Sequence, residues 1–437
     1  MTLKSSKTSH ALFVLSTCGS QSRRRPPVSP IRSHSAKLLR TPNRRNSRRT
    51  RQLPTTIVCR MDERTVRRNS GAGILSSAVP FELLVRMARL FWRQLWHLMM
   101  SQLAPTRKGT GSYERPPPSY LSSGYKDQIW TGSFEEDQFL LFYGIECPWC
   151  HRCLLAAAFH RLTDNSNASR IIVPVRVYPS PEGKWVLRPV GSRSNAEDAN
   201  ERLPATYRSA RDLKQIYRNA DPSFRGRATA PLLVDARSGL IVSNESADIV
   251  RFMRHIATER QTPSGIDPFP AEYQSQIEAD KTWIHDNLNN GVYKVGFART
   301  QAAYEDAERS VFQTLAELEQ RLAGQRYVSG TPYPSESDIF LFPTLIRFDS
   351  VYHTLFRCCQ RKITEFPNLH AWMRDMIQTY AAEVSHTFDV KETANSYFKS
   401  LFPLNPSGIV PKYDLGRLDV PHQREQLGAK PDSLQRP

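Results

Sequence analysis

The sequence predicts a mixed α/β domain followed by an all-helical domain, and three observations support this prediction. Between residues 136 and 257, short apolar runs typical of buried strands alternate with helical patterns. Between 276 and 388, apolar residues recur at helical spacing without a strand pattern of comparable quality. Of the 437 residues, 39% are hydrophobic and 23% are charged. That is enough apolar material for two cores, and it excludes a wholly disordered chain.

Residues 1–60 have the composition of a leader. They hold 14 Lys and Arg, ten Ser and seven Thr, but no Asp or Glu. An Arg-rich, Ser-rich, acid-free N-terminus is typical of an organellar transit peptide, and the stretch Ile57–Arg60 resembles a plastid processing site. We therefore expect a chloroplast protein, with the mitochondrion or the cytoplasm as alternatives. A basic tail that binds acidic surfaces non-specifically is the other interpretation.

Charge and hydropathy argue against two classes of partner. The net charge is +18, but most of it lies in the leader and not on a folded surface, so no nucleic-acid partner is expected. No run of 18 or more apolar residues is free of charge, so no transmembrane segment is expected.

Residues 61–135 are predicted to form an N-terminal extension with an amphipathic helix at 80–103. Its apolar residues recur at spacings of three and four, opposite a polar stripe. The apolar stripe is Leu84, Met87, Phe91, Leu95 and Leu98, and the polar stripe is Glu82, Arg86, Arg89, Arg93 and His97. We expect this helix to pack against its own domain, and attachment to a membrane surface is the alternative.

The α/β domain, 136–257, is predicted from five elements in order. They are a buried strand at Gln138–Tyr143, a helix at Cys153–Leu162, a β-branched strand at Arg170–Tyr178, a hairpin formed by Pro231–Asp235 and Leu240–Ser243, and a helix at Glu245–His255. Pro174 cannot donate to a sheet ladder and therefore places its strand at an edge. Strand, helix and strand followed by a hairpin and a helix is the order of a thioredoxin-like unit.

A linker is expected at 258–275, followed by the helical domain at 276–388 and a Pro-rich C-terminal extension at 389–437. The strongest helical patterns are Tyr304–Leu322, Ile339–Phe348 and Leu369–Ala381. Ser335 and Asp338 form a capping-box pattern at the start of the second of these helices, which we interpret as structural.

The segment with the clearest chemistry is Cys147-Pro148-Trp149-Cys150-His151-Arg152, which follows a strand and begins a helix. The free N–H groups and partial positive charge of a helix N-terminus stabilise a thiolate at the first cysteine. His151 and Arg152 are expected to add positive charge. Pro148 suits the first helical turn because its missing N–H would be unpaired there.

Three chemistries fit these residues. They are a thiol redox site, c-type haem attachment with His151 as ligand, and a zinc site that adds Cys153. The thioredoxin-like elements downstream favour the redox site, so no metal is expected. Five of the seven cysteines lie beyond the leader, an odd number without the spacing of a disulfide framework. We interpret Cys358 and Cys359 as structural.

Two further features suit a thiol enzyme. Pro231 precedes the hairpin, where thioredoxin-like folds place a cis-proline opposite the cysteine, so that the backbone of Ala230 faces a peptide-like ligand. Glu245 and Ser246 begin the next helix, whose free N–H groups can bind a carboxylate while Glu245 pairs with an ammonium group. A γ-glutamyl group carries both charges. A plain helix cap is the alternative.

Together these motifs resemble those of the Xi class of glutathione transferases, the glutathionyl-hydroquinone reductases. The resemblance covers about 320 residues, from Leu95 to Asp414, and its N-terminal part is similar to the cyanobacterial and plastid branch. The motifs that carry it lie at 98–105, 146–152, 220–231, 243–251, 289–298, 347–352 and 405–412. It implies a thioredoxin-like domain followed by an all-α glutathione-transferase C-terminal domain, and a homodimer.

The resemblance also implies the activity and the site. Cys147 would attack the sulfur of a glutathionyl-hydroquinone, release the hydroquinone, and be resolved by a second glutathione, the co-substrate. Tyr293, Tyr352 and Tyr397 would line the quinol pocket. Glutathione would be held by Trp185, Arg227, Ala230, Pro231, Glu245 and Ser246.

One departure from the family leaves alternatives open. Many relatives have Ala or Ser where this chain has Cys150, which would act as a resolving thiol in a dithiol glutaredoxin-like or dehydroascorbate reductase-like reaction. A non-catalytic interaction protein that docks through residues 80–103 is the alternative from another class.

Overall fold

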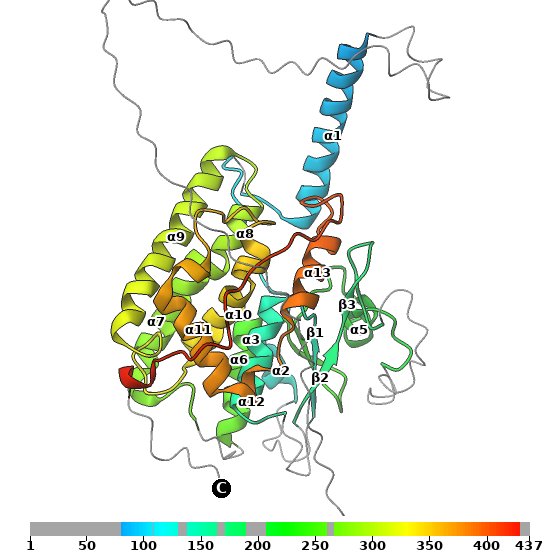
Figure 1. Cartoon of the computed structure of the whole chain (residues 1–437). Helices are drawn as coiled ribbons and strands as arrows, with labels where there is room; N and C mark the ends of the chain where they lie inside the picture. Colours follow the sequence, from blue (N-terminus) through cyan, green and yellow to red (C-terminus); the bar gives the residue numbers. More distant parts are fainter. Residues whose placement is uncertain are drawn as a thin grey trace, which may run out of the picture. The chain divides into compact units, whose positions relative to one another are not determined.

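The computed structural model of the chain describes residues 80–107, 109–129, 138–163, 171–188, 207–259 and 266–428 (Figure 1). All of them belong to one compact unit, Leu75–Pro437. The predicted transit peptide, 1–60, lies outside the described residues, as do the last residues of the C-terminal extension. Among the described residues, no helix has both the length and the apolar content needed to cross a bilayer.

The α/β domain is built on a four-stranded sheet with the order β2-β1-β5-β6. The strands are β1 (Phe139–Tyr143), β2 (Ile172–Arg176), β5 (Leu232–Asp235) and β6 (Ile241–Ser243). β1 runs parallel to β2 and antiparallel to β5, and β5 and β6 form the hairpin. Pro174 lies on β2 at the sheet edge, as predicted. A separate pair joins β3 (Tyr178–Pro179) to β4 (Trp185–Val186).

The two faces of this sheet bury different cores, because successive side chains of a strand point in opposite directions. Phe139 and Leu141 of β1 face α3 (Pro148–Phe159) and α6 (Ser246–Glu259) and belong to the larger core, which continues into the helical domain. Leu140 and Phe142 face the smaller core, beneath α5 (Leu213–Ala220). Helix α3, which begins at the cysteine motif, is therefore held between the sheet and the helical domain.

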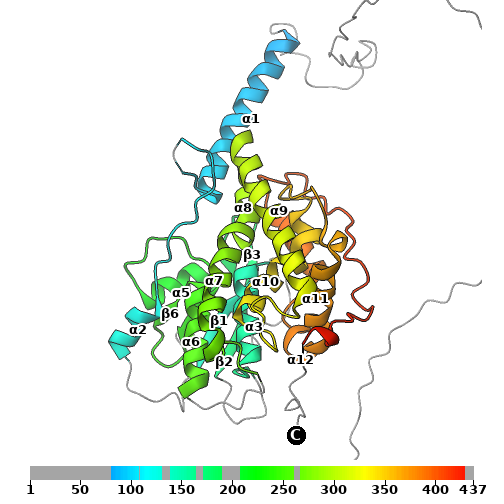
Figure 2. The same cartoon turned by 90° about the vertical axis from the view of Figure 1, so that its left-hand side faces the viewer.

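The helical domain packs on the α3 and α6 side of the sheet (Figures 1 and 2). Its helices are α7 (Gln274–Ile284), α8 (Gly291–Gly296), α9 (Gln301–Gly324), α10 (Glu336–Arg347), α11 (Pro367–Thr379), α12 (Ala381–Val384) and α13 (Val390–Ser400). Short 3-10 or π turns lie at η2 (Ala271–Tyr273), η3 (His285–Asn289), η4 (Phe348–Tyr352), η5 (Ile363–Glu365) and η6 (Glu425–Leu427). The predicted capping box of Ser335 and Asp338 is present at the start of α10.

The N-terminal extension contains α1 (Phe81–Leu103) and α2 (Ser122–Ile129). The amphipathic pattern predicted α1 correctly, but the expectation that it packs on its own domain is wrong for most of its length. Met100 is the only buried residue of α1, and Trp96 and Leu103 join it against the larger core. Leu84, Met87, Phe91 and Leu98 of the predicted apolar stripe are exposed.

Candidate active site

Cys147 lies at the N-terminus of α3, directly after β1. It is the N-cap residue, and its Sγ accepts a hydrogen bond from the backbone N–H of Cys150 at 3.3 Å. Pro148 occupies the first turn of the helix, as the sequence predicts. Strand, cap and helix together present the sulfur to the free N–H groups of the helix, where a negative charge is stabilised.

The surroundings of Cys147 favour its thiolate. Burial raises the pKa of Cys147, but hydrogen bonds from the thiol and the backbone N–H of Cys150 outweigh that effect and hold the pKa below its usual value. Arg115 adds a favourable charge, and Glu146 opposes it. Burial and the neighbouring Cys147 raise the pKa of Cys150 well above its usual value. Cys147 is therefore the thiolate nucleophile, and Cys150 stays a thiol that donates a hydrogen bond to it.

Substitution of Cys150 tests whether its thiol lowers the pKa of Cys147. Replacing Cys150 with Ala removes the S–H donor but keeps the backbone N–H, so we expect the pKa of Cys147 to rise. The measurement is the pH dependence of Cys147 alkylation by iodoacetamide, followed by mass spectrometry; its midpoint should move to higher pH.

Cys150→Ser is the matched control, because its hydroxyl can donate in place of the thiol, and its midpoint should lie closer to that of the wild type. A midpoint unchanged in Cys150→Ala would show that the backbone N–H alone sets the pKa.

His151 is not the positive charge that the sequence suggests. Nδ1 accepts from the Arg347 guanidinium at 2.8 Å, so Nε2 carries the proton and donates to the Thr387 hydroxyl at 2.9 Å. Burial, followed by the charge of Arg347, lowers the pKa of His151 well below its usual value. The imidazole is therefore neutral, and neither nitrogen is free for haem or zinc. Among the described residues, no group of three His, Cys, Asp or Glu side chains could hold a metal ion.

Arg347 fixes the turn that leads into the cysteine motif. This residue of α10 is fully buried, and its guanidinium donates to the carbonyls of Ile145 at 2.9 Å and Glu146 at 3.0 Å. It also donates to the carbonyl of Pro343 at 2.9 Å. A side chain of the helical domain thus positions the backbone directly before the nucleophile.

The predicted cis-proline is present opposite Cys147. The peptide bond between Ala230 and Pro231 is cis, and the carbonyl of Ala230 lies 3.6 Å from Cys147 Sγ, which donates to it as a thiol. The Tyr217 hydroxyl of α5 donates to the carbonyl of Thr229 at 3.0 Å and holds this loop. Ala230 therefore presents its backbone beside the sulfur.

Glu245 and Ser246 meet Arg152 at the start of α6. The buried guanidinium of Arg152 donates from Nε to the Ser246 hydroxyl at 3.0 Å and from Nη2 to Glu245 Oε1 at 3.4 Å. Burial raises the pKa of Glu245, but Arg152 and Arg115 outweigh that effect and hold it below its usual value. Glu245 is therefore an anion. No hydrogen bond to its Oε2 is present among the described residues.

Trp185 packs against the cysteine motif, and Arg227 lies on the loop before the cis-proline. Cys147, Trp149 and Cys150 form a small cluster against which Tyr143, Trp185, Ala230 and Tyr293 pack. A Cβ on Gly144 would lie 2.4 Å from the Trp185 ring, so only glycine permits this approach. Arg227 is exposed and donates to the carbonyl of Leu103 at 3.1 Å, at the end of α1. Its predicted contact with glutathione stays a prediction.

The three predicted tyrosines come together from three different elements. Tyr293 lies on α8, Tyr352 on η4 and Tyr397 on α13. The Tyr397 hydroxyl lies 2.7 Å from that of Tyr293 and 3.5 Å from that of Tyr352. The Tyr293 ring stacks on Trp149 of the cysteine motif, with centroids 5.8 Å apart. The tyrosine cluster therefore packs directly against the cysteine motif.

The tyrosines are proton donors at neutral pH. Burial and the neighbouring Tyr352 raise the pKa of Tyr293 well above its usual value. Burial also raises the pKa values of Tyr397 and Tyr352. All three hydroxyls keep their protons and can donate to an oxygen or carbon that gains negative charge.

The relatives of this chain carry the same combination of domains. A family profile described as "Glutathione S-transferase, C-terminal domain" matches residues 301–375. The chain is 33% identical over 342 residues to "Glutathionyl-hydroquinone reductase YqjG" of Escherichia coli K12, an alignment of 76% of this chain and 96% of that relative. It is 32% identical over 323 residues to "Glutathionyl-hydroquinone reductase PcpF" of Sphingobium chlorophenolicum, covering 73% and 93%. The chain belongs to the glutathionyl-hydroquinone reductase family.

Solved structures of this reductase family have the same fold. The glutathione-bound structure of E. coli YqjG is 35% identical, with a TM-score of 0.59, over 70% of this chain and 95% of that one. The Xi glutathione transferase from Phanerochaete chrysosporium is 32% identical, with a TM-score of 0.58, over 69% and 92%. The predicted fold class and the resemblance to the Xi class are confirmed. The cyanobacterial and plastid branch stays a prediction.

Sequence reasoning missed several residues at this reductase site. Arg115 lies in the predicted N-terminal extension, beyond its amphipathic helix, yet its guanidinium stands 4.2 Å from the centre of the Trp149 ring. Arg347 and Tyr217 each position a loop beside Cys147 from distant parts of the chain. The local signals are the charge of Arg115 in a Pro-rich stretch and the place of Arg347 at the start of the motif at 347–352; Tyr217 has none.

Proposed function

We propose that this enzyme reduces glutathionyl-hydroquinones to hydroquinones with glutathione as co-substrate. The observation that carries the proposal is the stacking of Tyr293 on Trp149, which places protonated phenols beside the activated Cys147 sulfur. A thiolate that attacks sulfur needs a proton donor for the group that leaves, and this site holds both. The names of the two curated relatives agree with this substrate class.

In the first half-reaction the Cys147 thiolate attacks the glutathionyl sulfur. An S–S bond forms between Cys147 and glutathione, the bond between that sulfur and the aromatic carbon breaks, and its electron pair goes to the carbon. One proton from the tyrosine cluster completes the hydroquinone. The sulfur is oxidised to a disulfide while the aromatic carbon is reduced, so the two-electron change balances.

In the second half-reaction a glutathione thiolate attacks the glutathionyl sulfur of the mixed disulfide. Oxidised glutathione leaves, and Cys147 returns as a thiolate, stabilised by Cys150 and the helix N-terminus. The sum is one glutathionyl-hydroquinone and one glutathione converted to one hydroquinone and one oxidised glutathione.

The glutathione groups have matching partners at the site. The free Oε2 of Glu245 suits the γ-glutamyl ammonium, and Ser246 with the first turn of α6 suits its carboxylate. The backbone N–H of Ala230 has no acceptor among the described residues, and it suits the cysteinyl carbonyl. Trp185 would contact the tripeptide from the other side.

The structure of the cysteine pair favours a single-thiol reaction over the dithiol alternative. Cys150 is fully buried, and its pKa lies well above the usual range, so it is a poor attacking group for a glutathione adduct. Intact-mass measurement after one equivalent of glutathione disulfide distinguishes the two. A persistent glutathione adduct supports the single-thiol reaction, and a Cys147–Cys150 disulfide without an adduct contradicts it.

The proposal is tested by product stoichiometry. Wild-type enzyme with a glutathionyl-hydroquinone and excess glutathione should form hydroquinone and oxidised glutathione in a one-to-one ratio. Inactivity on this substrate, combined with Cys150-dependent reduction of dehydroascorbate or small disulfides, would contradict the proposal but not the fold.

The Tyr397 hydroxyl is expected to contribute strongly to turnover, because it bonds to both other tyrosines. Tyr397→Phe keeps the ring and removes the shared proton, so kcat should fall about 10- to 100-fold with little change in KM for glutathione. Steady-state kinetics measure it. The buried Tyr327 pairs with Tyr380 away from this site, and Tyr327→Phe is the control that should leave kcat near wild type. Equal losses in both variants would assign Tyr397 a structural role.

We also propose import into a plastid and homodimerisation, on the composition of residues 1–60 and on the family resemblance respectively. A fluorescent protein fused behind residues 1–60 should accumulate in chloroplasts, and retention in the cytoplasm would refute the first proposal. Sedimentation velocity of the enzyme tests the second, since a monomer at micromolar concentration would refute it.

A further inference from the structure

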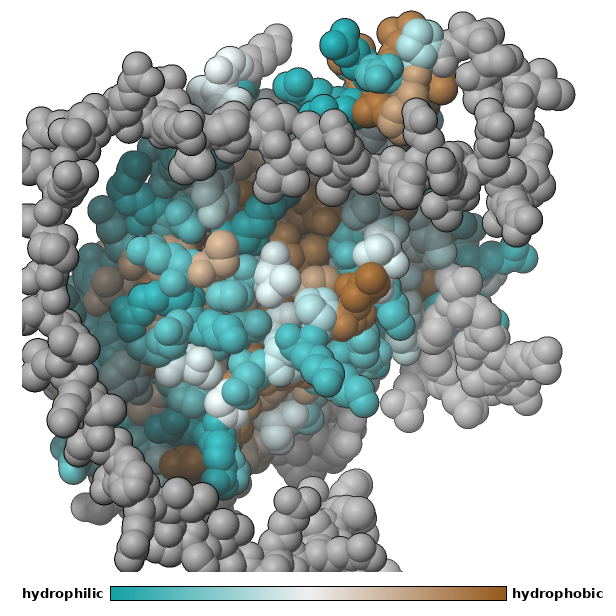
Figure 3. All heavy atoms as spheres, turned by 45° about the horizontal axis from the view of Figure 1, so that its top comes forward, coloured by the Kyte–Doolittle hydropathy of each residue, from teal (hydrophilic) through white to brown (hydrophobic). Residues whose placement is uncertain are grey.

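Helix α1 exposes a large apolar surface that nothing in the described chain covers. Phe81 is 76% exposed, Phe91 70%, Leu98 60% and Met87 59%. In the space-filling view, brown residues stand out at the top, in the direction of α1, while most of the facing surface of the body is teal (Figure 3). Contiguous exposed apolar side chains of this size mark a site of interaction.

The apolar stripe of α1 lies on the side away from the body. At 3.6 residues per turn, Arg86 and Arg93 share a side of the helix with Met100, the residue that is buried against the core. Phe91 and Leu98 lie on the other side. Contact with the body therefore uses the arginine side near the C-terminus and leaves the apolar stripe without a partner.

The polar side of α1 is cationic. It carries Arg86, Arg89 and Arg93 against a single acid, Glu82. Among the described residues, none of these arginines forms an ion pair, so their charge is available to a partner. A helix with aromatic and aliphatic residues on one face and arginines on the other is typical of helices that lie in a membrane interface.

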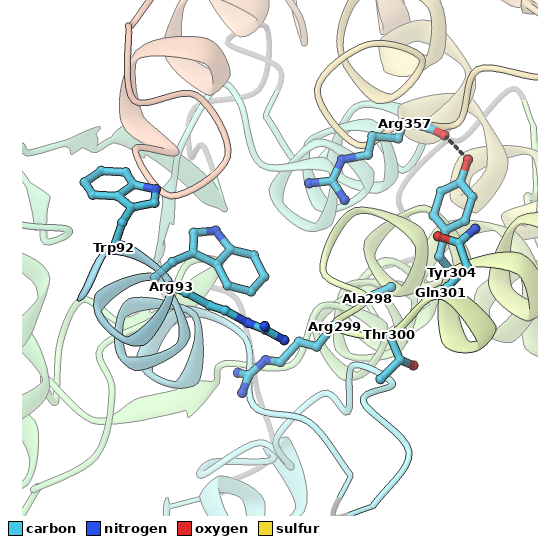
Figure 4. Close-up of a pocket in the computed structure, with 9 residues that line it drawn as sticks. Trp92, Arg93, Ala298, Arg299, Thr300, Gln301, Tyr304 and Arg357 are labelled. Atoms are coloured by element: carbon cyan, nitrogen blue, oxygen red, sulfur yellow. Dashed lines mark hydrogen bonds between the residues drawn. The ribbon is translucent and has the colours of Figure 1, made fainter. Parts of the chain in front are cut away.

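A pocket of about 570 Å³ beside α1 adds to this positive charge. Arg93, Arg299 and Arg357 line it together with Trp92 and Trp96, and no acidic residue does. Arg93 comes from α1, and Arg299 and Arg357 come from two segments of the helical domain (Figure 4). The Arg299 guanidinium also donates to the carbonyl of Ala104 at 2.8 Å. Arg299 Nε is buried without a partner among the described residues. Three cations without a counter-charge favour anions in this region.

We propose that α1 attaches the enzyme to the surface of a bilayer that contains anionic lipid. The apolar stripe enters the boundary between headgroups and acyl chains, and the arginines of α1 and of the adjoining pocket attract the headgroups. The helix lies on the membrane and does not span it, in agreement with its charge content. A second copy that covers the apolar stripe with its own α1 would bring one acid, Glu82, against the three arginines of this helix.

Co-sedimentation of the full chain with vesicles tests this proposal. The vesicles are phosphatidylcholine alone or phosphatidylcholine with one quarter phosphatidylglycerol. Wild type should bind the second and not the first. Met87→Ser with Phe91→Ser should weaken binding at least tenfold, and Arg86→Gln with Arg89→Gln should weaken it by about fivefold per charge.

Two matched control variants separate α1 from other parts of the chain. Leu121→Ser with Val420→Ser changes two exposed apolar residues outside α1, and Lys214→Gln with Arg218→Gln removes two exposed charges from α5. Both controls should bind like wild type, and all variants should keep reductase activity in solution.

Three outcomes would overturn the proposal. One is no binding by wild type, and another is equal binding by all variants, which would assign binding to the basic leader. The third is a dimer that Met87→Ser with Phe91→Ser dissociates without any effect on vesicle binding, which would make α1 a self-association surface.

Discussion

Replacing Cys147 with Ser is expected to lower kcat/KM for a glutathionyl-hydroquinone by at least about a thousandfold. The serine hydroxyl is protonated at neutral pH and cannot form the mixed disulfide, although it is close in size to the thiol. The measurement is steady-state formation of oxidised glutathione with excess glutathione, together with intact mass after substrate addition. The variant should show neither turnover nor an adduct.

Two cysteine variants make this result specific. Cys358 is buried in the helical domain, far along the chain from the motif, and Cys358→Ser should retain activity close to wild type. Cys150→Ser should keep a large share of the activity, because its hydroxyl still donates to Cys147. Loss of activity in Cys150→Ser equal to that in Cys147→Ser would instead support a dithiol reaction.

Replacing Arg347 with Met is expected to lower the free energy of unfolding by about 3–5 kcal/mol. The change removes the guanidinium donor from the carbonyls of Ile145, Glu146 and Pro343. The Ile145 carbonyl keeps the Thr393 hydroxyl at 3.3 Å. It also leaves His151 Nδ1 unpaired. Because two of these groups lead directly into Cys147, kcat/KM should fall as well.

Urea unfolding at neutral pH measures the stability change. Arg309→Met is the control, because Arg309 is exposed on α9 and pairs only with Asp306 three residues away. Such surface pairs contribute about 0.2–1 kcal/mol, so this variant should unfold close to wild type. A loss below about 1 kcal/mol in Arg347→Met would mean that water replaces the guanidinium without cost.

Local patterns were sufficient to predict most of the fold. The strand at Phe139–Tyr143, the hairpin, and helices α6, α9, α10 and α11 follow from apolar spacing within each segment. The cis-proline and the capping box were predicted for the same reason, since each depends on a few adjacent residues. Helix α13 was missed, because its sequence is mostly polar and it has only a narrow buried face.

The candidate site was less predictable wherever a contact joins distant segments. Basic residues next to a cysteine suggest added positive charge, but burial and the charge of Arg347, 196 residues away, lower the pKa of His151 and keep it neutral. The π turn η4 that carries Tyr352 has no sequence signal of its own. Amphipathicity located the apolar face of α1, but it could not tell whether that face meets protein or another surface.

The larger core couples the unfolding of the two domains. It runs without interruption from Phe139 of the sheet through α3 and α6 to Trp372 of the helical domain. Neither domain can open without exposing the apolar surface of the other, so both should exchange their slowest amide protons at one shared rate. The smaller core under α5 has no such tie to the helical domain. The amide protons of Tyr217 and of the loop that carries the cis-proline should therefore exchange faster than the amide proton of Cys147.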